Sequence, residues 1–180
     1  MAGLYESQGK YEEAEPLYKR SLGIRETKLG RDHPDVATTL NALAALYSSQ
    51  EKYKEAEPLF KRTLSIFEKA FGKDHLSVEI NLSNLALLYY KQEKYTEAIL
   101  LIKKSLIIIE KAAGKDHPSV TTTLNKLILL YESQGKYEEA KSLYNRSLGI
   151  VEKALGKNHP NYKTLMKKYQ ILSEKIQSSQ

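Results

Sequence analysis

Hydrophobic side chains recur at helical spacing in the segment PDVATTLNALAALYSSQ, residues 34–50. They lie at positions i, i+4, i+7, i+8 and i+11, namely Val36, Leu40, Leu43, Ala44 and Tyr47. This spacing places them on one face of an α-helix. Asp32 offers a capping side chain just before the segment, and Pro34 suits the first turn of a helix. The pattern therefore predicts an amphipathic helix that begins near Pro34.

A second helical pattern follows in KYKEAEPLFKRTLSIFEKAF, residues 52–71. One face carries Tyr53, Ala56, Phe60, Leu64, Phe67 and Phe71. Gly72 comes directly after this stripe, where a glycine commonly ends a helix. The short polar stretch SQEKY joins the two patterns. We therefore expect a helix hairpin over residues 34–75.

The hairpin pattern repeats every 42 residues, because equivalent positions fall at 11, 53, 95 and 137. The segment YESQGKYEEA occurs at residues 5–14 and again, unchanged, at residues 131–140. All four histidines obey the same spacing, at His33, His75, His117 and His159. A fixed period in this range is typical of repeat proteins, in which neighbouring copies bury a shared hydrophobic face. The sequence therefore predicts an all-α tandem array.

We expect the array to form a single domain over residues 1–180. Its units are a partial first repeat (1–33), a second (34–75), a third (76–117), a fourth (118–159) and a C-terminal capping helix (160–180). Leu4 and Tyr5 correspond to Leu46 and Tyr47, in the middle of a helix. We therefore expect the chain to be a fragment of a longer array. The polar residues Lys167 and Lys168 suit the outer side of a capping helix.

The positions Leu43-Ala44, Tyr47, Tyr53, Ala56, Phe60 and Leu64 resemble the spacing of the tetratricopeptide repeat (TPR) family. The 42-residue unit, longer than the usual 34 residues, is similar to the repeats of kinesin light chains and of bacterial TPR arrays. The resemblance implies a right-handed superhelical solenoid of antiparallel helix hairpins. It also implies a non-catalytic scaffold that binds a protein or peptide segment in a concave groove lined by the first helix of each hairpin.

The same resemblance implies which residues would face the groove, namely those of the first helices that lie off the packing stripe. These are Thr38, Asn41, Ala45, Ser48, Ile80, Ser83, Leu87, Tyr90, Lys91, Thr122, Asn125, Leu129 and Glu132. Asparagine offers both donors and an acceptor to a peptide backbone, and the aliphatic side chains offer apolar contact. We expect a peptide-binding groove at these residues.

A second hypothesis is self-association into a structural array. The segment TEAILLIKKSLIIIEK, residues 96–111, places aliphatic residues where the second repeat has Glu57, Pro58, Ser65 and Phe67. The four residues are Ile99, Leu100, Ile107 and Ile109. Clustered exposed aliphatic side chains mark interaction surfaces. This helix or the ends of the array would then hold the copies together, whereas local repacking of the core would explain the same residues without self-association.

The composition of the chain argues against a membrane protein and against a nucleic-acid partner. The chain has no cysteine, which fits a reducing compartment, and no apolar stretch long enough for a membrane span, so we expect a cytoplasmic protein without membrane contact. The net charge of +6 is concentrated in residues 157–180, which carry five lysines and one glutamate. This basic segment is small and has little aromatic interleaving, so nucleic acid is not predicted as a partner.

The four histidines are candidates for metal binding or catalysis. Asp32, Asp74 and Asp116 each precede a histidine, but successive copies lie a whole helix pair apart and cannot converge on one metal ion. Capping and ordering of the linkers explain these residues better. We therefore predict no metal, no cofactor, no small-molecule substrate and no catalytic residue.

Overall fold

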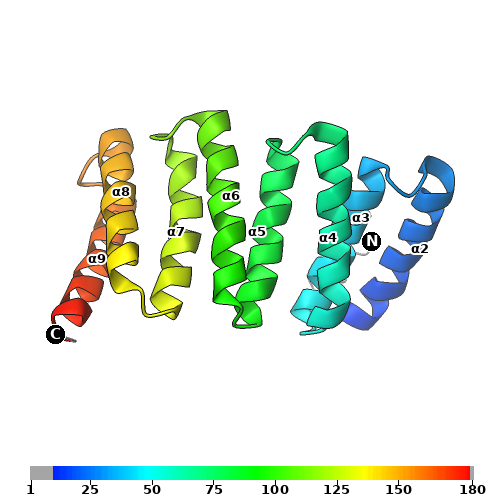
Figure 1. The fold of residues 1–180 in the computed structure, drawn as a ribbon, viewed down its shortest axis with the longest axis horizontal. Helices are drawn as coiled ribbons and strands as arrows, with labels where there is room; N and C mark the ends of the chain where they lie inside the picture. Colours follow the sequence, from blue (N-terminus) through cyan, green and yellow to red (C-terminus); the bar gives the residue numbers. More distant parts are fainter. Residues whose placement is uncertain (1–9, 179–180) are drawn as a thin grey trace. The chain divides into compact units, whose positions relative to one another are not determined.

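The computed structural model describes residues 10–178, which form eight α-helices and no strand (Figure 1). The first helices of the repeats are α3 (Pro34–Ser49), α5 (Leu76–Lys91), α7 (Pro118–Ser133) and α9 (Pro160–Ser178). The second helices are α2 (Tyr11–Leu29), α4 (Tyr53–Phe71), α6 (Tyr95–Ala113) and α8 (Tyr137–Leu155). The predicted all-α repeat fold is confirmed. The expected half helix at Leu4 and Tyr5 lies outside the described residues.

The helices are distributed over two compact units, Met1–Gln92 and Glu93–Gln180. In the first unit, α2 packs against α3, α3 against α4, and α4 against α5. In the second unit, α6 packs against α7, α7 against α8, and α8 against α9. The single continuous domain expected from the sequence stays a prediction.

The alanine that recurs in every second helix is fully buried at all four positions: Ala14, Ala56, Ala98 and Ala140. A small side chain allows the backbones of neighbouring helices to approach closely. Larger residues fill the remaining space, and Val36, Ala37, Leu40 and Ile66 form one cluster of the first unit. In the second unit a larger cluster includes Ile128, Tyr144, Leu165 and Leu172. The hydrophobic stripes predicted from the sequence therefore meet between the helices.

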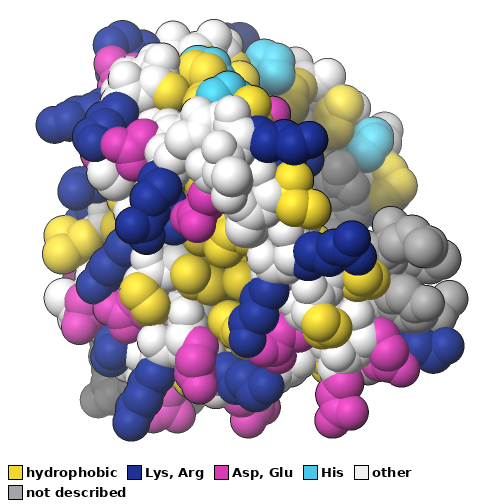
Figure 2. All heavy atoms as spheres, turned by 90° about the vertical axis from the view of Figure 1, so that its right-hand side faces the viewer, with side chains coloured by type: hydrophobic (Ala, Val, Ile, Leu, Met, Phe, Trp, Pro, Cys, Tyr) yellow, Lys and Arg dark blue, Asp and Glu magenta, His cyan; other side chains and the backbone are white. Residues whose placement is uncertain are grey.

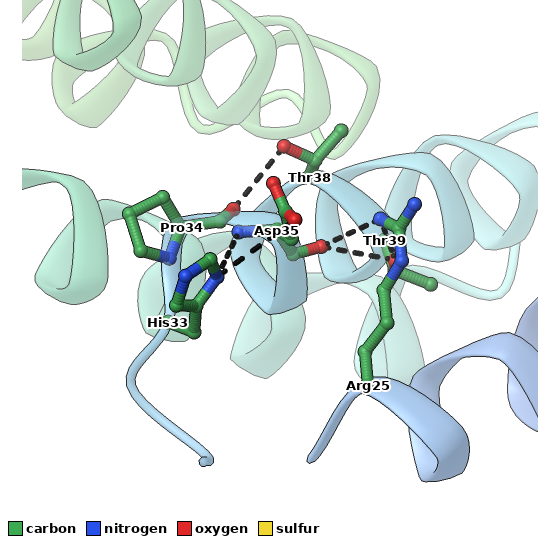
Figure 3. A network of polar contacts seen from close by, with 6 residues as sticks. All are labelled: Arg25, His33, Pro34, Asp35, Thr38 and Thr39. Carbon is green, nitrogen blue, oxygen red and sulfur yellow. Dashed lines mark hydrogen bonds and ion pairs between the residues drawn. The ribbon is translucent and has the colours of Figure 1, made fainter. Parts of the chain in front are cut away.

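Each histidine of the repeat caps the first helix that follows it. His33 has an extended backbone, and its Nδ1 accepts a hydrogen bond from the backbone N–H of Asp35 at 3.1 Å (Figure 3). His75, His117 and His159 accept the equivalent bond at 3.1, 3.2 and 3.2 Å. The expectation that Asp32 caps this helix was wrong, because the Asp32 carboxylate instead accepts from Lys69 Nζ at 3.1 Å. The repeated histidines therefore have a structural role at helix N-termini.

A contact from α2 fixes the start of α3 as well. Arg25 Nη1 donates to the Asp35 carbonyl and to Thr39 Oγ1, both at 2.8 Å (Figure 3). The Thr38 hydroxyl donates to the Pro34 carbonyl at 3.2 Å within the first turn. The N-terminal turn of α3 is thus held by its own cap and by the preceding helix.

We expect His33→Ala to lower the free energy of unfolding by about 1 kcal/mol, the usual loss for removing an N-cap side chain. Asp32→Ala is the matched control. It removes only an exposed ion pair with Lys69, which should change stability by less than about 1 kcal/mol. Urea unfolding followed by circular dichroism measures both. A larger loss in Asp32→Ala than in His33→Ala would contradict the assignment of the cap.

Candidate ligand-binding groove

A hollow of about 480 Å³ lies in the second unit among α7, α8 and α9. Helix α7 contributes Thr121, Thr122, Asn125, Ile128, Leu129 and Glu132. Helix α8 contributes Tyr144, Ser147 and Val151, and helix α9 contributes Asn161, Thr164, Leu165 and Lys168. Two first helices therefore form its walls, together with one face of the second helix between them.

The hollow has an apolar floor and a polar rim because of how its helices pack. Ile128, Tyr144, Val151 and Leu165 belong to the buried hydrophobic cluster of this unit, so their side chains are fixed by core packing. The neighbouring positions on the same helices are exposed and polar, among them Thr122, Asn125, Asn161 and Thr164. Sites for small or extended ligands commonly combine such an apolar surface with a few polar groups.

Three chemically distinct groups line one part of the hollow: Glu132, Tyr144 and Lys168. Burial, the negative charge of Glu132 and a hydrogen bond to Glu132 together raise the pKa of Tyr144 to about 12, with burial the largest cause. Tyr144 is therefore a neutral phenol at pH 7. The same three residues border a second hollow of about 300 Å³, which also includes Ile171 and Lys175.

Ser147 supplies an unsatisfied polar atom at the floor. Its side chain is fully buried, and its Oγ has no hydrogen-bond partner among the residues that the structure describes. At the equivalent position of α4, the Thr63 hydroxyl donates to the carbonyls of Leu59 and Ala37. A buried hydroxyl without a partner carries an energetic penalty. Because Ser147 has no exposed surface, its hydroxyl lies behind the floor and is not open to a ligand in the hollow.

The corresponding helices of the first unit are bridged by side chains. Asn41 Oδ1 accepts from Asn81 Nδ2 at 3.3 Å and from Asn84 Nδ2 at 3.1 Å, which links α3 to α5. Lys91 Nζ donates to the carbonyl of Ser48 at 3.2 Å, near the C-terminus of α3. Asn41 and Lys91, both expected to face a groove, are thus already engaged within the protein.

The structure separates the thirteen expected groove residues into three classes. Seven are exposed: Thr38, Ile80, Leu87, Lys91, Thr122, Asn125 and Leu129. Four are partly buried: Asn41, Ala45, Tyr90 and Glu132. Ser48 and Ser83 are buried, which does not support the expectation that their side chains face a ligand. Ser83 lies on a side of α5 where its hydroxyl donates to Glu79 Oε1 at 3.1 Å. Of the thirteen expected groove residues, only the four that lie on α7 line the hollow.

Sequence reasoning missed the contribution of α9. Asn161, Thr164 and Lys168 line the hollow, although this helix was expected to act as a cap with Lys168 on its outer side. A further step of the 42-residue period leads from Thr122 to Thr164, so the signal was present in the sequence. Tyr144 and Ser147 lie on a second helix, and no periodicity distinguishes them from core residues.

The four aliphatic residues of α6 do not share one surface. Leu100 and Ile107 are exposed, as expected, whereas Ile99 is buried and Ile109 is partly buried. Glu15 and Glu57, the equivalents of Ile99, accept hydrogen bonds from Tyr47 and Tyr89 of the next first helix, each at 3.0 Å. This position therefore faces a neighbouring helix, which explains why Ile99 is buried. Ile109 packs against the cluster that contains Val120 and Leu124.

Another large hollow among residues 10–178, of about 780 Å³, surrounds the linker before α3, where His33 caps the helix and Asp32 and Arg62 form ion pairs. No three histidine or acidic side chains in this range are grouped as metal ligands would be. None of the described helices is both long and apolar enough to cross a membrane. The face seen in Figure 2 mixes basic and acidic side chains around small hydrophobic areas, without a large field of one charge. The hollow of the second unit is therefore the candidate functional site.

Comparison with known proteins gives consistent results along the whole chain. The family model described as tetratricopeptide repeat matches residues 1–69, 50–111, 77–153 and 119–169. A kinesin-light-chain-like protein of Podosopora anserina with nearly identical TPR-like repeats has a TM-score of 0.84 at 24% identity, covering 98% of this chain and 90% of that chain.

Two further solved structures resemble the chain. BtubC (BKLC) from P. vanneervenii has a TM-score of 0.74 at 20% identity, covering 98% of this chain and 78% of its own. The N-terminal domain of stress-induced protein-1 from C. elegans has a TM-score of 0.59 at 15% identity, covering 78% of this chain and 96% of that domain. At these identities the likeness concerns the fold.

Proposed function

Because the chain belongs to the tetratricopeptide repeat family, a family of protein interaction scaffolds, we propose that it binds a peptide or protein segment in the hollow between α7 and α9. The observation that carries the proposal is this hollow itself, in which exposed polar residues of α7 and α9 border an apolar floor of Ile128, Val151 and Leu165. The family is a non-catalytic repeat scaffold, and we propose no chemistry for this chain.

The lining suits an extended polypeptide. Asn125 and Asn161 each offer amide donors and a carbonyl acceptor that pair with peptide N–H and C=O groups. The floor residues Ile128 and Val151 offer apolar contact to one inserted side chain. A volume of about 480 Å³ lies within the range of roughly 300–1,000 Å³ that is usual for ligand sites. Shape and chemistry therefore both support a short segment of a partner protein.

The two charged residues of the hollow have opposite signs. Glu132 and Lys168 line the same hollow, so a bound segment meets one acidic and one basic group. Tyr144, held neutral beside Glu132, supplies a phenol hydroxyl within the apolar surroundings. We propose that these three residues set the orientation of the segment, because its polar groups are matched in only one direction.

The test is a peptide-display selection against the full chain, followed by titration of the enriched peptides in solution. Thr122→Arg should weaken their binding by at least about tenfold, because the larger cationic side chain occupies the wall of the hollow. Thr38→Arg is the matched control, since Thr38 is the equivalent exposed residue of α3 in the other unit. We expect this control to bind the peptides as the wild type does.

Thermal unfolding of both variants shows whether the fold is retained. Failure of the selection to enrich any peptide would contradict the proposal. Peptide affinities that stay unchanged in both Thr122→Arg and Leu129→Ala would equally contradict it.

A further inference from the structure

Helix α6 presents two strongly exposed aliphatic side chains. Leu100 and Ile107 are 58% and 62% exposed, the highest values among the large hydrophobic residues in the described part of the chain. They lie seven positions apart, which is about two helical turns, so they project from the same side of α6. This pair forms a short apolar stripe, which we call the α6 stripe.

The other second helices show that the fold does not require this stripe. The position of Leu100 is occupied by Pro16, Pro58 and Ser142 in the other repeats. The position of Ile107 is occupied by Gly23, Ser65 and Gly149. Both positions are exposed in every described second helix. Since the same backbone position tolerates proline, serine or glycine, Leu100 and Ile107 contribute a surface that only α6 carries.

Basic side chains surround the α6 stripe. Lys103 and Lys104 lie between Leu100 and Ile107 along the helix, and Lys111 lies one turn after Ile107. All three are exposed, and Glu97 is the exposed acidic residue before Leu100. The Lys103 ammonium group lies 5.7 Å from the centre of the Tyr131 ring, which keeps this positive charge beside the stripe. The surface therefore combines two apolar anchors with an excess of positive charge.

A second copy of α6 is a poor occupant of such a surface. If two copies packed antiparallel about a twofold axis, Leu100 of one would meet Ile107 of the other. Lys103 and Lys104 would then lie at the centre and face their own copies, which is electrostatically unfavourable. The charge complementarity instead favours an acidic occupant.

We propose that the α6 stripe binds an amphipathic helix of a partner protein, with aliphatic residues on one side and glutamate or aspartate residues beside them. Two anchors separated by two turns match the i, i+3/i+4 and i+7 spacing of such a helix. The acidic residues of the partner pair with Lys103 and Lys104. This surface is separate from the hollow between α7 and α9, so the chain would bind two protein segments at once.

The experiment uses the full chain and a fluorescent synthetic helix of about 18 residues, or five turns, with leucines at i, i+3 and i+7 and glutamates beside them on an alanine background. A comparator peptide has lysine in place of every glutamate. Fluorescence anisotropy should show binding of the glutamate peptide, weaker binding at high salt and at least about tenfold weaker binding of the lysine comparator.

The variant Leu100→Ser/Ile107→Ser introduces side chains that α8 and α4 already carry at these positions, so its fold is expected to be retained. It should weaken binding of the glutamate peptide by at least about tenfold, and Lys104→Glu should also weaken it. Thr122→Arg should leave this binding unchanged, which separates the α6 stripe from the groove of α7 and α9.

Three results would overturn the proposal. One is the absence of binding, and another is equal binding of the two peptides or of the wild type and the double variant. The third is a concentration-dependent dimer in sedimentation experiments that Leu100→Ser/Ile107→Ser dissociates, because the occupant would then be a second copy of this chain.

Discussion

Replacing Phe60 with alanine is expected to lower the free energy of unfolding by about 3–5 kcal/mol. Phe60 is only 2% exposed and is the largest of the fully buried side chains in the described residues. The substitution removes the transfer free energy of an aromatic ring and leaves a cavity that the rigid helix packing fills only partly. Urea unfolding followed by circular dichroism measures the loss.

Phe71→Ala is the matched control, because it removes the same ring from the same helix. Phe71 is 45% exposed, and its ring stacks on that of His75 with the centres 4.6 Å apart. We expect Phe71→Ala to lower the free energy of unfolding by about 1 kcal/mol or less. A half-exposed ring gains little free energy from burial, and a stacked aromatic pair contributes about 1 kcal/mol. Similar losses in both variants would contradict the assignment of Phe60 to the core.

The same two residues show how far the hydrophobic pattern predicts this fold. Both lie on the predicted stripe of α4, and the helix forms as its periodicity indicates. Periodicity identifies the face that a residue occupies but does not show how far along the helix a neighbour covers that face. Phe71 is the last residue of α4 and remains half exposed there. Element type was therefore predictable, whereas burial at helix ends was not.

The caps illustrate a different limit. Aspartate is a preferred N-cap residue, so the sequence favoured Asp32 over His33. The geometry of the linker determines which residue takes the extended N-cap conformation. In the structure this residue is His33. The recurrence of histidine at 42-residue spacing is visible in the sequence, and it indicates a structural role for these residues.

The candidate site was predicted in part because its walls follow the repeat. Thr122, Asn125, Leu129 and Glu132 were expected from their positions on the first helix of the fourth repeat, and they line the hollow. Ser48 and Ser83 follow the same rule but are buried in the first unit, where side-chain hydrogen bonds link α3 to α5. Local spacing is the same in both units, and tertiary packing decides where a hollow opens.

The buried phenol of Tyr144 should make the second unit sensitive to alkaline pH. Its pKa is raised to about 12 from an ordinary value of 10.0, first by burial and then by Glu132. Between these two values the unfolded chain loses the proton while the folded chain keeps it, so the unfolded state binds fewer protons. Stability is therefore fully present below pH 10 and falls as the pH rises toward and through about 12.

Tyr144→Phe removes this hydroxyl and leaves every other residue unchanged, so the difference between the two proteins isolates the contribution of Tyr144. The full difference in pKa corresponds to about 2–3 kcal/mol of stability that the wild type loses across this range and the variant does not. Urea unfolding of both proteins at pH 9 and at pH 11.5 measures the difference. Parallel losses in the two proteins would show that Tyr144 ionises as readily in the folded chain as in the unfolded one. The phenol would then be open to water, and the floor of the proposed groove would not be the apolar surface on which peptide binding depends.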